Sequence, residues 1–234
     1  MALQQLPLNL RLRDDYSYAS YIARGNEQVL AALRSSEPDP LLYLWGVPGS
    51  GKTHLLHAAT QAMLDAQGAA ALLSLTEDRP DARICQGLEQ CRLIGIDGVD
   101  ALQADHGWQT ALFHLLNRAQ ESGARIILTA RAAPQGLTQL FADLRSRLSA
   151  GLIFEVNELV DDDKITALQQ RARMRGFVLG DEVARYLLHH SQRDSHSLFA
   201  LLDRLDQSSL TSQRRLTVPF VKQVLSEDAD QQVR

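Results

Sequence analysis

The sequence predicts an α/β domain with a parallel five-stranded sheet, followed by a small domain built only of helices. Through the first two-thirds of the 234 residues, short apolar runs alternate with stretches whose apolar residues recur at helical spacing. After Val156 the apolar runs stop and only helical patterns remain. Strands separated by helices are typical of a doubly wound parallel sheet with helices on both faces.

Five apolar runs have the length and composition of buried strands. In chain order they are LLYLW at 41–45, AALLSL around Leu72, RLIGID ending at Asp97, RIILTA around Ile127 and LIFEV around Phe154. Amphipathic stretches such as THLLHAATQAML and GWQTALFHLLNRAQESG lie between them, and Gly123 is the expected stop of the second. Each run therefore predicts one strand of the same sheet.

Four helical patterns make up the second domain: DDDKITALQQRARMRG, DEVARYLLHHS, SHSLFALLDRLDQSSL and VPFVKQVL. Gly176 suits the end of the first helix, and Pro219 suits the first turn of the last. We expect an N-terminal peptide at 1–15, the α/β domain at 16–158, the helical domain at 159–226 and a disordered tail at 227–234.

The composition is that of a globular protein, with 45% apolar residues, 22% charged residues and a net charge of -4. No apolar run approaches the roughly 20 residues that cross a bilayer, and no secretory signal is recognisable. We therefore expect a cytoplasmic protein without membrane contact. The net charge gives no electrostatic footprint for wrapping nucleic acid. Cys85 and Cys91 lack a second pair at metal-ligand spacing, which favours reduced structural thiols.

The strongest motif is GVPGSGKT, which lies directly between the first strand and a helix. This is the context of a P-loop: glycines turn backbone N–H groups toward phosphates, the lysine reaches the terminal phosphates, and the threonine hydroxyl ligates Mg²⁺. The sequence thus predicts that the cofactors are ADP or ATP with Mg²⁺. The expected nucleotide contacts come from Pro48, Gly49, Ser50, Gly51, Lys52, Thr53 and His54.

Acidic and polar residues end the third and fourth strands. Asp97 is the expected Mg²⁺ carboxylate, although a strand-end Asp also serves as a helix cap. Many ATPases of this architecture carry a second acid directly afterwards to polarise the attacking water, and this chain has Gly98 there. Asp100 lies past the expected strand end and is a poor substitute, so we expect weak or no intrinsic ATPase. Gly98→Glu is expected to raise the rate unless His196 still limits it. Thr129 suits either a phosphate contact or a structural role.

Two arginines, Arg145 and Arg147, lie near the end of a short helix that precedes the fifth strand. One interpretation is a solvated basic helix end, which is favourable for the helix dipole. The other is an arginine finger that reaches a nucleotide on a neighbouring molecule.

Taken together, GVPGSGKT, IDGVD, ILTARAAP, LRSRLSAG and the tail RDSHSLFALLDRLDQSSLTSQRRLTVPFVKQVL resemble the AAA+ ATPases related to the replication initiator DnaA. The resemblance is closest to the Hda family, which inactivates that initiator. It implies an AAA+ domain with a helical lid, an arginine finger in trans at Arg147, sensor 1 at Thr129 and the Mg²⁺ carboxylate at Asp97.

The same resemblance identifies three further parts of the nucleotide site. The sensor-2 position, usually Arg in the family, falls on His196, with Arg193 one turn earlier. Neutral His is a weaker phosphate ligand than Arg, which favours a protein that works with bound diphosphate. Tyr21 and Ile22 lie where such proteins hold the adenine.

The N-terminal stretch QLPLNL looks like the peptide by which replication proteins dock into the DNA sliding clamp, with Gln5, Leu6, Leu8 and Leu10 as its anchors. An extended peptide with anchors on alternate residues needs no fold of its own and becomes ordered on binding. The alternative is an edge strand with the three leucines buried on one side.

The resemblance implies a negative regulator of replication initiation that is cytoplasmic and associated with the replisome. With the DNA-loaded clamp, it makes the DnaA initiator hydrolyse its ATP. Two alternatives are a self-assembling P-loop ATPase, hence a homo-oligomer, and a nucleotide-dependent recruitment module. Arg171, Arg173 and Arg175 at the end of the first lid helix are interpreted as a solvated face first, and as a weak contact to DNA or the initiator second.

Overall fold

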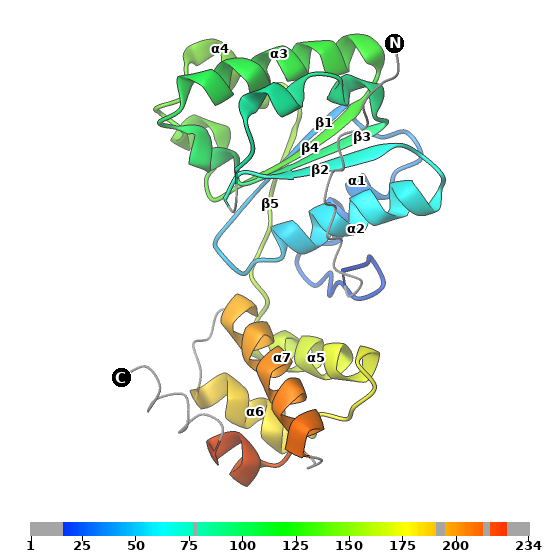
Figure 1. The fold of residues 1–234 in the computed structure, drawn as a ribbon, viewed down its shortest axis with the longest axis vertical. Helices are drawn as coiled ribbons and strands as arrows, with labels where there is room; N and C mark the ends of the chain where they lie inside the picture. The colour runs from blue at the N-terminus through cyan, green and yellow to red at the C-terminus, as the bar shows by residue number, and fades with distance from the viewer. Residues whose placement is uncertain (1–15, 77–78, 191–194, 213–215, 224–234) are drawn as a thin grey trace. The chain divides into compact units, whose positions relative to one another are not determined.

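The computed structural model describes residues 16–76, 79–190, 195–212 and 216–223. These residues form two compact units that divide close to Asn157 (Figure 1). Within the described ranges, no helix combines the length and the apolar character needed to cross a membrane.

The first unit is built on a sheet of five parallel strands in the order β2-β3-β4-β1-β5. The strands are β1 (Leu41–Trp45), β2 (Ala70–Ser74), β3 (Leu93–Asp97), β4 (Arg125–Ala130) and β5 (Leu152–Glu155). The prediction of a parallel five-stranded sheet is confirmed. Because the strands are parallel, the residues that follow β1, β3 and β4 meet at one edge.

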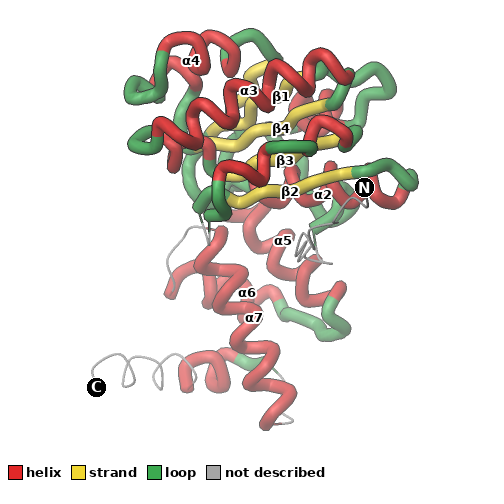
Figure 2. Tube along the Cα trace, turned by 45° about the horizontal axis from the view of Figure 1, so that its top comes forward, coloured by secondary structure: helices red, strands yellow, loops and turns green. Residues whose placement is uncertain are grey.

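Helices cover both faces of the sheet, with α1 and α2 on one face and α3 and α4 on the other (Figures 1 and 2). Period-two alternation along β1 explains the two layers: Leu42 and Leu44 join the apolar cluster of α1 and α2, and Tyr43 joins that of α3 and α4. The helices are α1 (Glu27–Leu33), α2 (Lys52–Asp65), α3 (His106–Ser122) and α4 (Ala142–Leu148). Short 3-10 turns are η1 (Ala82–Cys85), η2 (Leu88–Gln90), η3 (Val99–Leu102) and η4 (Pro134–Gly136).

Local signals set the ends of α3. The Asp105 side chain accepts the Trp108 N–H at 3.1 Å and so caps the first turn. At the other end Gly123, with φ +74°, takes the left-handed conformation that stops a helix. The sequence prediction of this stop is confirmed.

The described residues of the second unit form helices joined by turns and irregular segments, with no strand among them. It contains α5 (Asp161–Met174), α6 (Asp181–His190) and α7 (Ser195–Ser212), and residues 218–223 are helical as well. Leu168, Leu187, Leu202 and Val221 are buried in a core of its own. The expected helical lid domain is therefore present.

Candidate functional site

The P-loop begins at the carboxyl end of β1. Trp45, the last residue of β1, pairs with Ala130, the last residue of β4. Gly46 then donates its backbone N–H to the Ala130 carbonyl at 3.3 Å. From there the chain turns into α2, which starts at Lys52. The loop is thus fixed between a central strand and a helix N-terminus, where backbone N–H groups are available to an anion.

Two glycines give the loop its shape. Gly49 and Gly51 have φ values of +83° and +96°, a region that favours glycine because other residues are strained there. A Cβ at Gly51 would also lie 3.0 Å from the Tyr21 ring. The segment that the resemblance assigns to the adenine therefore packs directly against the phosphate loop.

Lys52 extends into the P-loop itself. Its ammonium donates hydrogen bonds to the carbonyl oxygens of Gly46 at 2.8 Å and Val47 at 2.7 Å. Burial lowers the pKa of Lys52, while the carboxylates of Asp97 and Asp100 oppose that shift. A buried cation in a ring of backbone groups fits the phosphate group of a nucleotide.

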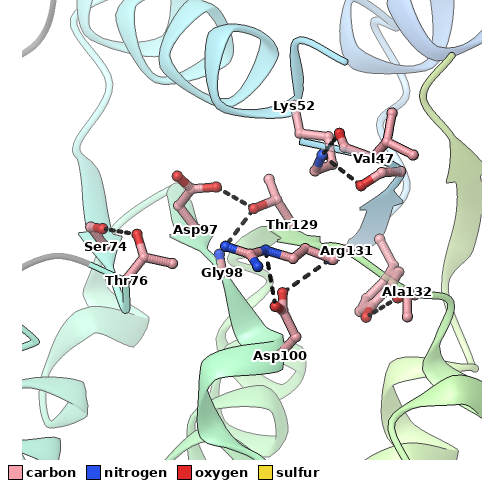
Figure 3. A network of polar contacts seen from close by, with 12 residues as sticks. Val47, Lys52, Ser74, Thr76, Asp97, Gly98, Asp100, Thr129, Arg131 and Ala132 are labelled. Atoms are coloured by element: carbon pink, nitrogen blue, oxygen red, sulfur yellow. Dashed lines mark hydrogen bonds and ion pairs between the residues drawn. The ribbon is translucent and has the colours of Figure 1, made fainter. Parts of the chain in front are cut away.

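Asp97, at the end of β3, accepts hydrogen bonds from two hydroxyl groups, and Figure 3 shows the one from Thr129. The Thr53 hydroxyl donates to Oδ2 at 2.9 Å, and the Thr129 hydroxyl of β4 donates to Oδ1. A carboxylate beside a hydroxyl fits Mg²⁺, which binds to one or two protein groups and completes its shell with phosphate and water. The described residues hold no cluster of three or more His, Cys, Asp or Glu side chains that would bind a metal alone.

Gly98 has a backbone that a larger residue cannot easily adopt. Its φ is +83°, and a Cβ there would lie 2.4 Å from the Thr76 methyl group. Its N–H donates to the Thr129 hydroxyl at 3.0 Å. The structure therefore gives no support to the expectation that Gly98→Glu raises the hydrolysis rate, because a side chain there is strained by the backbone and must push the Thr76 side chain aside.

Asp100 lies beyond β3, in η3, and its side chain still contacts the site. Its Oδ1 accepts the backbone N–H of Arg131 at 3.0 Å, and its Oδ2 lies 3.7 Å from the Arg131 Nε (Figure 3). Both residues act electrostatically on Lys52. The sequence interpretation missed Arg131, whose only sequence signal is its place directly after β4.

An aromatic segment covers the start of α2. The ring of His54 stacks on Tyr16 with 4.7 Å between centroids and meets Tyr21 edge-on at 5.3 Å. Its Nε2 lies 2.9 Å from the Ser17 carbonyl oxygen and 3.2 Å from the Ser20 hydroxyl. His54 thus anchors residues 16–21 beside the P-loop, a role that the sequence did not indicate. Ile22 follows directly and is half-buried.

Arg147 lies at the opposite edge of the sheet. It belongs to α4 and donates from Nη1 to the Gln120 side chain of α3 at 2.9 Å. Both line a cavity of about 340 Å³ with Leu41 and Leu152, the first residues of β1 and β5. The length of β1, about 15 Å, separates this edge from the P-loop. Arg147 therefore lies far from the nucleotide site of its own chain.

Each of the two units matches a known protein family. The family described as the bacterial DnaA ATPase domain matches residues 16–155, which is more than half of the chain, and the family described as the Hda lid domain matches residues 161–225. The chain belongs to the Hda/DnaA-like family. Its first unit is thus a DnaA-like AAA+ domain, and its second is an Hda lid.

Solved structures show the same fold. Domain III of the DnaA replication initiation protein from Thermotoga maritima is 19% identical, with 95% of this chain and 98% of that chain covered and a TM-score of 0.79. AMPPCP-bound DnaA from Aquifex aeolicus is 23% identical, with 84% and 66% covered and a TM-score of 0.66. The Thermotoga maritima RuvB branch migration motor is 19% identical, with 92% and 72% covered and a TM-score of 0.65. At these identities the likeness concerns the fold alone.

Several positions that the Hda/DnaA resemblance singles out lie outside the described residues. They include Arg193 and the side chain of His196, whose backbone is in the first turn of α7. The N-terminal anchors Gln5, Leu6, Leu8 and Leu10 lie outside as well. Their roles stay predictions.

The lid arginines do not form one solvated face. Arg171 is buried and donates two hydrogen bonds to Asp203 of α7, from Nε at 3.2 Å and from Nη2 at 3.0 Å. Arg175 lies 2.9 Å from the same carboxylate. The interpretation as a solvated surface is wrong for Arg171, because its guanidinium joins α5 to α7; Arg173 is exposed.

Proposed function

We propose that this Hda/DnaA-like protein binds ADP or ATP with Mg²⁺ at the P-loop. In this proposal Lys52 binds the terminal phosphates, and Thr53 and Asp97 hold the ion; the burial of Lys52 in the P-loop and the Thr53–Asp97 hydrogen bond support these roles. The bound Mg²⁺ would neutralise phosphate charge. The aromatic segment held by His54 would provide the wall against which the base packs. The similar DnaA from Aquifex aeolicus carries a triphosphate analogue, AMPPCP.

The observation that carries the regulatory function is the separation of Arg147 from the P-loop of its own chain. An exposed arginine at the far edge of the sheet reaches a nucleotide only on another molecule. We infer that this molecule is the DnaA initiator, and that Arg147 stabilises the charge that develops during hydrolysis of the initiator's ATP. The chain thereby acts as a negative regulator of replication initiation.

The N-terminal peptide supplies the second partner. Gln5, Leu6, Leu8 and Leu10 have the spacing of a peptide that docks in the apolar pocket of the sliding clamp. A clamp loaded on DNA would bring the regulator close to DNA-bound initiator without a DNA contact of its own. Tethering of this kind raises the effective concentration of Arg147 at its target.

Intrinsic hydrolysis is expected to be weak. Gly98 provides no carboxylate beside Asp97, and Asp100 is already hydrogen-bonded to Arg131. The same placement of Arg147 also suits a homo-oligomer in which each copy completes the site of the next. Turnover of ATP by the isolated chain would support that second function.

The test is single-turnover hydrolysis of labelled ATP preloaded on the initiator, with DNA-loaded clamp present. Arg147→Ala should reduce the stimulated rate by roughly 10³-fold or more, as loss of a trans finger does in GTPases, and should leave the protein folded. Arg147→Lys should fail nearly as badly, because an ammonium lacks the planar bidentate geometry.

The matched control is Arg145→Ala. Arg145 lies on the same helix and donates a long hydrogen bond, 3.4 Å, to the Thr138 carbonyl. The Arg145→Ala protein should stimulate ATP hydrolysis by the initiator as strongly as the parent protein does. An Arg147→Ala protein that stimulates normally would refute the finger and favour a recruitment module in which nucleotide serves only as a ligand.

A further inference from the structure

Arg131 enters the nucleotide site from β4. It follows Ala130 directly, and the Ala130 carbonyl accepts the N–H of Gly46, the first residue of the P-loop. Thr129, two residues before Arg131, donates to Asp97. Arg131 therefore lies at the end of β4, between the P-loop and Asp97, the expected Mg²⁺ ligand.

The ion pair between Arg131 and Asp100 holds the guanidinium weakly. The Asp100 carboxylate accepts the Arg131 backbone N–H at 3.0 Å, whereas its distance to the side-chain Nε is 3.7 Å (Figure 3). The Arg131 side chain is 70% exposed and that of Asp100 only 18%. Exposed ion pairs at this distance contribute little free energy. The guanidinium is thus positioned through its backbone and is open to a stronger anion.

Two cations share this edge of the sheet. Lys52 of the P-loop and Arg131 after β4 both bring a positive charge to this edge, and two like charges at one site repel each other (Figure 3). An anion bound at this edge relieves that repulsion more fully than the Asp100 carboxylate does, because it attracts both cations. A phosphate group also matches the planar guanidinium, which donates two parallel hydrogen bonds.

The position of Arg131 indicates which phosphate of a bound nucleotide would lie nearest to it. In P-loop proteins the backbone surrounds the α- and β-phosphates, and the ion bridges the β- and γ-phosphates. Arg131 follows the strand whose Thr129 contacts Asp97, the expected ligand of that ion. The anion nearest to Arg131 is then the last phosphate of a triphosphate.

We propose that Arg131 is a second phosphate-binding cation of this site, and that it binds the terminal phosphate of a nucleoside triphosphate in competition with Asp100. This inference rests on the proposed nucleotide binding and adds a residue that distinguishes triphosphate from diphosphate. With diphosphate bound, the guanidinium stays with Asp100. With triphosphate bound, it moves to the phosphate.

The experiment is calorimetric titration of the full chain with ADP and with the non-hydrolysable triphosphate AMPPCP, both with Mg²⁺. Arg131→Ala should weaken AMPPCP binding by about tenfold or more, the effect of one charge-assisted hydrogen bond, and should leave ADP binding within about twofold. Arg131→Lys should lose part of the AMPPCP affinity. Asp100→Asn should raise AMPPCP affinity relative to ADP, because the competing charge is removed while the amide oxygen still accepts the Arg131 N–H.

Arg92→Ala is the matched control, since Arg92 is exposed at the opposite edge of the sheet, directly before β3, and should change neither affinity. Equal weakening of ADP and AMPPCP by Arg131→Ala, or no change in either, overturns this inference while the proposed function stands. Wild-type protein that binds neither nucleotide overturns both.

Discussion

At the scale of single residues, the geometry at the carboxyl edge of the sheet depends on the backbone conformation of Gly98. Its φ is positive, and a Cβ there would lie 2.4 Å from the Thr76 methyl group, so a side chain is strained and must displace that methyl group. The N–H of Gly98 meanwhile holds the Thr129 hydroxyl that contacts Asp97. The glycine that replaces the second acid therefore helps to arrange Asp97 and Thr129.

We expect Gly98→Glu to lower the free energy of unfolding by about 2–4 kcal/mol, from left-handed strain and overpacking together. It should not raise ATP turnover. Urea denaturation and a steady-state ATPase assay measure both effects. Gly87→Ala is the control, because Gly87 has φ +88° with nothing within 4 Å of its Cβ position, and so reports the backbone cost alone. A Gly98→Glu protein as stable as Gly87→Ala and faster in turnover would contradict this account.

At the scale of elements, the sheet and the lid helices are predictable because their signals are local. Each strand is a short apolar run, and each lid helix shows its own periodicity. The sequence could place four site residues together: Lys52, Thr53, Asp97 and Thr129. The P-loop follows β1, Thr129 lies near the end of the adjacent β4, and Asp97 ends β3 on the other side of β4.

Other parts of the site had no local signal. The Asp100 contact with Arg131 spans 31 residues, and the His54 contact with Ser17 spans 37. These contacts depend on how the η3 turn and the N-terminal segment pack, which no periodicity encodes. The same holds for Arg171, whose helix-end position looks solvated until α7 is in place.

The pair Arg171–Asp203 joins α5 to α7, and its loss should weaken the lid. Asp203→Ala leaves a buried guanidinium without its bidentate acceptor, and should cost about 2–3 kcal/mol. The cost stays below that of a fully buried pair because the Asp203 side chain is 31% exposed. Arg173→Ala, on the same helix but exposed, should cost less than about 0.5 kcal/mol. Denaturant unfolding, followed by the circular dichroism of the helices, measures the free energy of unfolding of both variants. Equal losses in the two variants would refute a structural role for the Arg171–Asp203 pair.

At the scale of the whole molecule, the function proposed for the chain is divided among three places. The P-loop holds nucleotide at the carboxyl edge of the sheet, Arg147 acts from the amino edge, and residues 5–10 provide the tether. The tether and the finger contribute differently to the rate. A tether changes the local concentration of Arg147, whereas the finger lowers the barrier of the chemical step.

This division gives the last prediction. Changing Gln5 and Leu6 together to Ala should abolish binding to the clamp, while nucleotide affinity and the unfolding temperature stay nearly unchanged. Gln4→Ala, adjacent to the peptide motif, should bind the clamp normally. A large loss of stability in the double variant would instead show that the leucines belong to the core as an edge strand.

The two defects should then separate in the initiator assay when the regulator concentration is raised. The Gln5, Leu6 double variant keeps Arg147, so a high concentration in solution replaces the effective concentration, in the millimolar range for short linkers, that the clamp tether provides. Its stimulation of initiator ATP hydrolysis should return. Arg147→Ala should stay inactive at every concentration, because no amount of tethering supplies the guanidinium. If both variants recover in parallel, Arg147 contributes binding rather than chemistry, and the trans-finger mechanism is refuted.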